Sequence, residues 1–168
     1  MRSAAAKGFT LVQLVVVIAV LAILTGVLVP RVSDHMAVAR DARRLADVRT
    51  IRTAIEQYRM DKGGFPAAER NPAFGGWDVS HDGGFIRELR NEGYIDGEHV
   101  DPVNDVTYHY RYFLYEMGSF GCAGEEDFYV LGVRNFESPN FARKHQGFFE
   151  CANRDWGKEF AYVTGGGA

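Results

Sequence analysis

Apolar and polar residues are distributed very unevenly along the chain. No residue from Leu14 to Leu24 is polar, and with the flanking apolar positions the run reaches about 20 residues. A helix of that length crosses roughly 30 Å of hydrocarbon. The pattern therefore predicts a transmembrane helix over residues 9–30, with Gly26 and Pro30 as weak points where a bend or a locally melted turn is expected.

Beyond Pro30 the pattern becomes amphipathic. No Gly or Pro interrupts residues 31–62, whereas Gly63 and Gly64 follow at once and Pro66 comes shortly after. We therefore expect the helix to continue over residues 31–62 and to reach about 54 residues in total. The predicted apolar face consists of Val38, Leu45, Val48, Ile51, Ile55 and Tyr58. Charged residues, namely Arg40, Arg43, Arg44, Asp47, Arg49, Glu56 and Arg59, are expected to cover the remaining surface.

Residues 63–168 have the patterns of a small α+β head. A Gly- and Pro-rich loop is expected over 65–80 and a short helix over 85–92. Strong strand formers occupy 107–116, with Tyr110 and Tyr112 on one side and Phe113 and Tyr115 on the other, and further strands are expected over 127–137 and 159–165. The predicted fold is α+β, a long N-terminal helix packed on a small antiparallel sheet.

The predicted helix and the predicted head differ in charge. The chain has a net charge of -3, but residues 31–62 carry eight basic and five acidic side chains, while residues 63–168 carry nine and seventeen. One interpretation is that these are simply solvated faces. The other is that basic stems and acidic heads of adjacent copies attract each other. Because the head lacks a basic surface run, no specific nucleic acid is predicted as a partner.

The residues before the apolar run form an unusual processing signal. Arg2 and Lys7 are basic and should keep this end in the cytoplasm. The plausible cleavage point, Gly8 followed by Phe9, lies in front of the apolar run, whereas an ordinary secretory signal is cut behind it. This arrangement resembles the class III signal of the type IV pilin and type II secretion pseudopilin superfamily. A looser similarity continues through Tyr58, Asp61, Gly63, Phe65 and Pro66.

The resemblance implies a specific processing route. Residues 1–8 would be a leader removed by a prepilin peptidase, Phe9 would become the methylated N-terminus, and residues 63–168 would be exported. One position departs from the family pattern, because Gln13 stands where a glutamate is usual. In the family that glutamate is thought to compensate a neighbouring N-terminal ammonium, and a neutral amide cancels no charge. A minor or specialised subunit is one interpretation of this change.

Two cysteines, Cys122 and Cys151, lie in the predicted exported head. In an oxidising compartment we expect them to form a disulfide that closes a loop of about 30 residues. The polar connection over 138–147 lies inside this loop and would otherwise be floppy. A metal site that includes His109 or His145 is the alternative, and it needs more ligands than the spacing offers.

The sequence gives little indication of a catalytic site or of a metal site. The sequence contains no G-x-S-x-G or H-E-x-x-H motif, its five histidines share no pattern, and His81 with Asp82 and His99 with Asp101 are interpreted as solvated loop pairs. We therefore predict no enzyme and no required cofactor. One turn-rich stretch offers oxygen ligands for calcium, and ordinary turn chemistry is the alternative. The four candidate ligands are Glu98, Asp101, Asn104 and Asp105.

Taken together, the patterns favour a structural subunit of a type IV pilus or type II secretion pseudopilus. It would wait in the inner membrane with its head in the periplasm and would then be assembled by an inner-membrane platform into a homo- or heteropolymer. The assembly residues implied are Gln13, Gly26 and Pro30, with Ala19 and Ala22 allowing close helix approach. The alternatives are a membrane-tethered envelope binding module that does not polymerise and, less favoured, a membrane-anchored enzyme.

Overall fold

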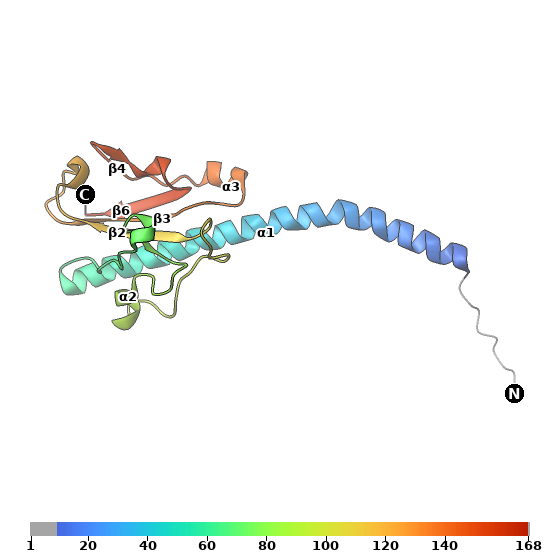
Figure 1. Cartoon of the computed structure of the whole chain (residues 1–168), viewed down its shortest axis with the longest axis horizontal. Helices are drawn as coiled ribbons and strands as arrows, with labels where there is room; N and C mark the ends of the chain where they lie inside the picture. The colour runs from blue at the N-terminus through green and yellow to red at the C-terminus, as the bar shows by residue number, and fades with distance from the viewer. Residues whose placement is uncertain (1–9, 168) are drawn as a thin grey trace, which may run out of the picture. The chain divides into compact units, whose positions relative to one another are not determined.

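The computed structural model describes residues 10–167, and for residues 27–30 it describes the backbone alone. The chain divides into two units, Met1–Ala37 and Val38–Ala168. Helix α1, Leu11–Lys62, contributes to both of them (Figure 1).

The described part of the first unit is helical from Leu11 onward. The backbone remains helical through Gly26 and Pro30, so the local melting expected there does not occur. A single proline removes one backbone donor, and the hydrogen bonds on either side of it are enough to keep the helix continuous.

In the second unit, α1 ends where the sequence predicts. Gly63 adopts a left-handed conformation with φ of 77°, and its N–H donates to the carbonyl of Arg59 at 2.9 Å. This is the hydrogen bond of an αL cap, which glycine forms without a steric penalty. The helix stop is therefore a local property of the chain.

A four-stranded antiparallel sheet forms the centre of the second unit. Its order is β1 (Asp78–Val79), β2 (Tyr110–Tyr115), β3 (Phe128–Val133) and β6 (Tyr162–Gly166). Strands β2 and β3 lie within the predicted ranges, β6 extends one residue beyond its range to Gly166, and the α+β prediction is confirmed. Strand β1 falls in a stretch predicted to be loop, because two residues are too few to show alternation.

The two faces of the sheet pack against different layers. Alternate strand residues, such as Tyr112 and Leu131, contact the apolar side of α1 and helix α2 (Arg87–Asn91). The others, such as Val130 and Val163, form a second core with Trp156. The predicted alternation along residues 107–116 is confirmed, since Tyr110 and Tyr112 belong to the first core and Phe113 and Tyr115 to the second.

The second core is covered by short elements that sequence periodicity does not reveal. Helix α3 (Pro139–Lys144) replaces the floppy connection expected over 138–147, and Ser138 caps it by accepting from the Phe141 N–H. A two-stranded hairpin follows, β4 (Glu150–Cys151) with β5 (Arg154–Asp155). The remaining 3-10 turns are Pro72–Phe74, Ser119–Gly121 and Trp156–Lys158.

Candidate functional site: an exposed apolar helix and a buried ion cluster

The first part of α1 presents apolar side chains that the chain itself does not cover. From Leu11 to Leu24 the large apolar residues expose between 48% and 77% of their surface. Such a helix is long and apolar enough to cross a membrane, and among the described residues it is the only one that meets this criterion. At Gly26 an added Cβ would meet no other atom within 4 Å, which leaves room for another helix to approach.

Gln13 has a defined local partner at the start of this helix. Its side-chain Oε1 accepts from the Thr10 N–H at 2.9 Å, and the Thr10 hydroxyl accepts from the Gln13 N–H at 3.3 Å. This reciprocal pair is a capping box. The spacing Thr-x-x-Gln ahead of an apolar run was the signal for it, and the sequence interpretation missed it. A glutamine can therefore replace a glutamate as a cap at this position, although it supplies no charge.

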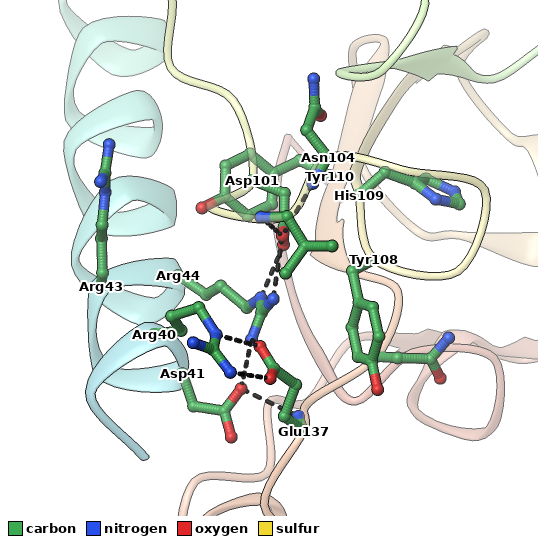
Figure 2. A network of polar contacts seen from close by, with 12 residues as sticks. Arg40, Asp41, Arg43, Arg44, Asp101, Asn104, Tyr108, His109, Tyr110 and Glu137 are labelled. Atoms are coloured by element: carbon green, nitrogen blue, oxygen red, sulfur yellow. Dashed lines mark hydrogen bonds and ion pairs between the residues drawn. The ribbon is translucent and has the colours of Figure 1, made fainter. Parts of the chain in front are cut away.

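The most heavily buried charges lie where α1 meets the head. Arg44 is fully buried, although the amphipathic pattern assigned it to the polar surface. Its Nε donates to Asp101 Oδ2 at 2.6 Å and its Nη2 to Asp101 Oδ1 at 2.9 Å. Its Nη1 contacts Asp41 Oδ1 at 2.6 Å and Glu137 Oε1 at 2.8 Å. One guanidinium thus binds carboxylates from three segments of the chain (Figure 2).

The carboxylates of this cluster have further partners. Asp41 accepts from the backbone N–H groups of Glu137 at 3.0 Å and Ser138 at 2.8 Å. Arg40 donates through Nε to Glu137 Oε1 at 2.8 Å. The hydrogen bond from Arg40, opposed by burial and aided by Arg44, lowers the pKa of Glu137 to about 2. The cluster holds two cations against three carboxylates, so it is nearly neutral and well hydrogen-bonded.

The four candidate calcium ligands each have a different partner. Asp101 binds Arg44 and also accepts from the Val103 N–H at 2.9 Å. Glu98 accepts from the Gly84 N–H at 3.0 Å, Asn104 from the Ser80 hydroxyl at 2.9 Å, and Asp105 from the Thr107 and Tyr108 N–H groups.

Within residues 10–167, no group of three or more His, Cys, Asp or Glu side chains could hold a metal ion. The geometry therefore gives no support to the calcium candidate, and the Asx turn that was its alternative is present at Asp101.

The disulfide between Cys122 and Cys151 is present. It joins the loop that connects β2 and β3 to strand β4, and this fixes the small hairpin against the second core. The alternative metal site does not form, because both sulfurs are bonded to each other.

The histidines are less scattered than their positions in the chain suggest. The rings of His81 and His109 lie 4.8 Å apart. His109 donates from Nδ1 to the Asp105 carbonyl at 3.0 Å and accepts at Nε2 from Arg111 at 2.9 Å.

Burial, with the nearby Arg111, lowers the pKa of His109 to about 4. A neutral ring with both nitrogens occupied has no free position for acid–base chemistry.

The two predicted loop pairs also differ from expectation. Asp82 accepts from the Asn71 side chain, and His81 packs on Phe74 instead of pairing with Asp82. His99 faces helix α1, with Nδ1 at 3.6 Å from Asp47 Oδ1. Turn-rich sequence does not show which loop residues fold back onto the helix.

The residues of the predicted processing site, Gly8 and Phe9, lie outside the described residues. Pro30 lies within α1, but for this residue only the backbone is described. The geometry therefore bears on Gln13 and Gly26 and leaves the processing site as a prediction.

Comparison with known proteins finds relatives named as type II secretion proteins and relatives named as type IV fimbrial proteins. The chain is 27% identical over 131 residues to "Type II secretion system core protein G" of Aeromonas hydrophila, covering 76% of this chain and 82% of the relative. The protein of the same name from Pseudomonas aeruginosa is 25% identical, with 76% and 83% covered. "Type IV major fimbrial protein FimA" of Dichelobacter nodosus is 33% identical over 94 residues, with 55% and 57% covered.

No protein-family model matches the chain, and no solved structure matches it significantly. The names of the relatives support a place in the pilin and pseudopilin superfamily. They are names of structural subunits, which is consistent with a protein that is not an enzyme.

Proposed function

We propose that the chain is a structural subunit of a pilin-type filament, a type II secretion pseudopilus or a type IV pilus. The observation that carries the proposal is the exposed apolar part of α1, Leu11 to Leu24, in a helix that continues as an integral part of a folded head. An apolar helix of this kind is stable in lipid and can also be buried in a bundle of like helices. Its similarity to secretion and fimbrial proteins supports the same function.

The proposed route begins with a precursor in the inner membrane, with its N-terminus in the cytoplasm and its head in the periplasm. A prepilin peptidase cleaves between Gly8 and Phe9 and methylates Phe9. An inner-membrane platform then moves α1 from lipid into a polymer of like subunits. Apolar burial against lipid is exchanged for apolar burial against other helices, so the transfer costs little hydrophobic free energy.

Processing is tested by incubating the precursor with purified prepilin peptidase and measuring the product by mass spectrometry. The wild type should lose residues 1–8 and carry a methylated Phe9. Gly8→Leu should remain at full length, whereas Gly26→Ala, a glycine replacement with free space around it, should be processed normally. An unprocessed wild type would contradict the proposal.

Assembly is tested separately in the native host. Single cysteines placed along residues 14–29 should form cross-linked oligomers if the helices bundle. A chain that is processed normally but never cross-links would identify the alternative, a tethered binding module that does not polymerise.

A further inference from the structure

One side of α1 within the head carries arginines on a background of small residues. The exposed positions over residues 42–53 are Ala42, Arg43, Ala46, Arg49, Thr50, Arg52 and Thr53, here called the arginine face. None of them is acidic. Arg43 has a long contact of 3.7 Å with Asp47 and is 66% exposed, and within residues 10–167 Arg49 has no carboxylate within 4.0 Å.

The loop between β2 and β3 has the opposite charge. Residues 116–127 contain four carboxylates and no Lys or Arg, and we call this segment the acidic loop. Glu116, Glu125 and Asp127 are exposed, and Met117 and Phe120 expose apolar surface beside them. The fourth carboxylate, Glu126, pairs with Arg59 of the same chain.

The two surfaces lie at different ends of the head. The contact between Glu126 and Arg59 places the end of the acidic loop beside the last turn of α1. Arg49 precedes Arg59 by ten residues and Arg43 by sixteen, which correspond to about 15 and 24 Å along the helix. At this separation the acidic loop of one copy does not reach Arg43 or Arg49 of the same copy.

We propose that the acidic loop of one copy docks on the arginine face of the next copy. The surfaces are complementary in charge, and the Ala and Thr residues between the arginines let another chain approach the helix closely. A contact between two different surfaces is heterologous, so its repetition produces an open filament when the rotation does not close. This inference rests on the proposed function, and it names the surfaces that set the register between copies.

The pairing is tested by reversing charges in the full-length chain and quantifying filaments by electron microscopy. Arg43→Glu with Arg49→Glu reverses the arginine face, and Glu116→Lys with Glu125→Lys reverses the acidic loop. Either variant should lower the filament yield by about tenfold or more, because like charges would then face each other. The four changes together should restore most of the yield, because opposite charges would face each other again.

Matched controls carry the same change in net charge elsewhere on the head. Arg143→Glu with Lys144→Glu changes exposed residues of α3, and Asp96→Lys with Glu150→Lys changes exposed acids outside the acidic loop. Both controls should assemble as the wild type does. Thermal unfolding of each variant in detergent checks that the head is folded.

The outcomes separate the two proposals. Normal filament yield in both reversed variants would overturn the docking inference and leave the proposed function intact. Loss of filaments in both, without recovery when the four changes are combined, would also overturn it. Absence of filaments from processed wild-type protein in its host would instead refute the proposed function.

Discussion

The buried ion cluster gives the sharpest test of how the head is attached to α1. Replacing Arg44 by Met keeps much of the side-chain volume and removes the guanidinium. Arg44 and Asp41 are fully buried, and Asp101 is 2% exposed. The Arg44→Met variant would therefore leave the carboxylates of Asp41 and Asp101 in a dry environment without their cation.

The expected loss of stability follows from a general property of buried ion pairs, which is that removing one partner costs more than the intact pair contributes. Removal of one partner strands a charge away from water, and this costs about 3 to 5 kcal/mol, even though the intact pair contributes far less. Here one guanidinium serves three carboxylates, and Arg40 remains beside Glu137 alone. We expect the free energy of unfolding to fall by about 3 to 5 kcal/mol, which is a large part of the stability of a small head.

The assay is urea unfolding of the full-length chain in a mild detergent, followed by near-ultraviolet circular dichroism of the buried tyrosines and tryptophans. Arg43→Met is the matched control, because it removes a neighbouring arginine that is 66% exposed and has one contact of 3.7 Å. Its effect should stay below about 1 kcal/mol. Adding Asp101→Asn to Arg44→Met removes one stranded charge and should recover about 1 to 2 kcal/mol.

Equal effects of Arg44→Met and Arg43→Met would refute this account of the cluster. So would a further loss of stability when Asp101→Asn is added, since that would mean that Asp101 is not stranded by the loss of Arg44. Either result would place the attachment of the head in the apolar contacts of α1 and in its other ion pairs.

Four further predictions concern single contacts. Cys122→Ser with Cys151→Ser should lower the free energy of unfolding by about 3 to 4 kcal/mol, and reduction should not affect this variant in the same urea assay. Burial raises the pKa of Asp78 to about 7, so stability should fall as pH rises from 4 to 7, and Asp78→Asn should flatten that slope. The pKa of Glu137, lowered to about 2, predicts stability that is lost as pH falls from about 4.5 to 2, and Glu137→Gln should abolish this loss. Gln13→Ala should speed amide exchange in the first turn of α1, whereas Gln13→Glu, which keeps the acceptor, should not.

Much of the fold could be predicted because its longest elements are specified locally. Helix α1 has an apolar run, then a helical apolar stripe, and then Gly63 in the left-handed region. Strand β2 is a run of strong strand formers, and β3 is a continuous apolar run that is buried on both faces of the sheet. Strands of two residues, such as β1 and β4, are too short to show any sequence pattern. Strand β1 forms because the longer strand β2 lies beside it. Strand β4 is held in place by the disulfide between Cys151 and Cys122.

The ion cluster could be predicted only in part. Arg44 lies four residues before Val48, and Val48, Ile51, Ile55 and Tyr58 continue the same stripe, so its spacing is that of the buried side, although its charge assigned it to the polar surface. An arginine at a buried position needs carboxylate partners. Its partner Asp101 is 57 residues away, and no local pattern indicates which acidic residue of a loop will fold back onto the helix.

The sequence has an excess of basic residues over 31–62 and of acidic residues over 63–168. The structure divides these charges into two groups. Arg40, Arg44, Arg59 and Lys62 are occupied within the chain, and their partners come from the acidic head. This part of the asymmetry stabilises a single copy, because it attaches the head to the helix. Within residues 10–167, Arg49 lies among them on the same helix without a carboxylate within 4.0 Å, at an exposed position that is not part of either core. Within residues 10–167, the carboxylates of the acidic loop form one ion pair, between Glu126 and Arg59. The surplus of each sign is thus found on a different surface, and a second copy of the chain could bring the two surfaces together, as the docking proposal requires.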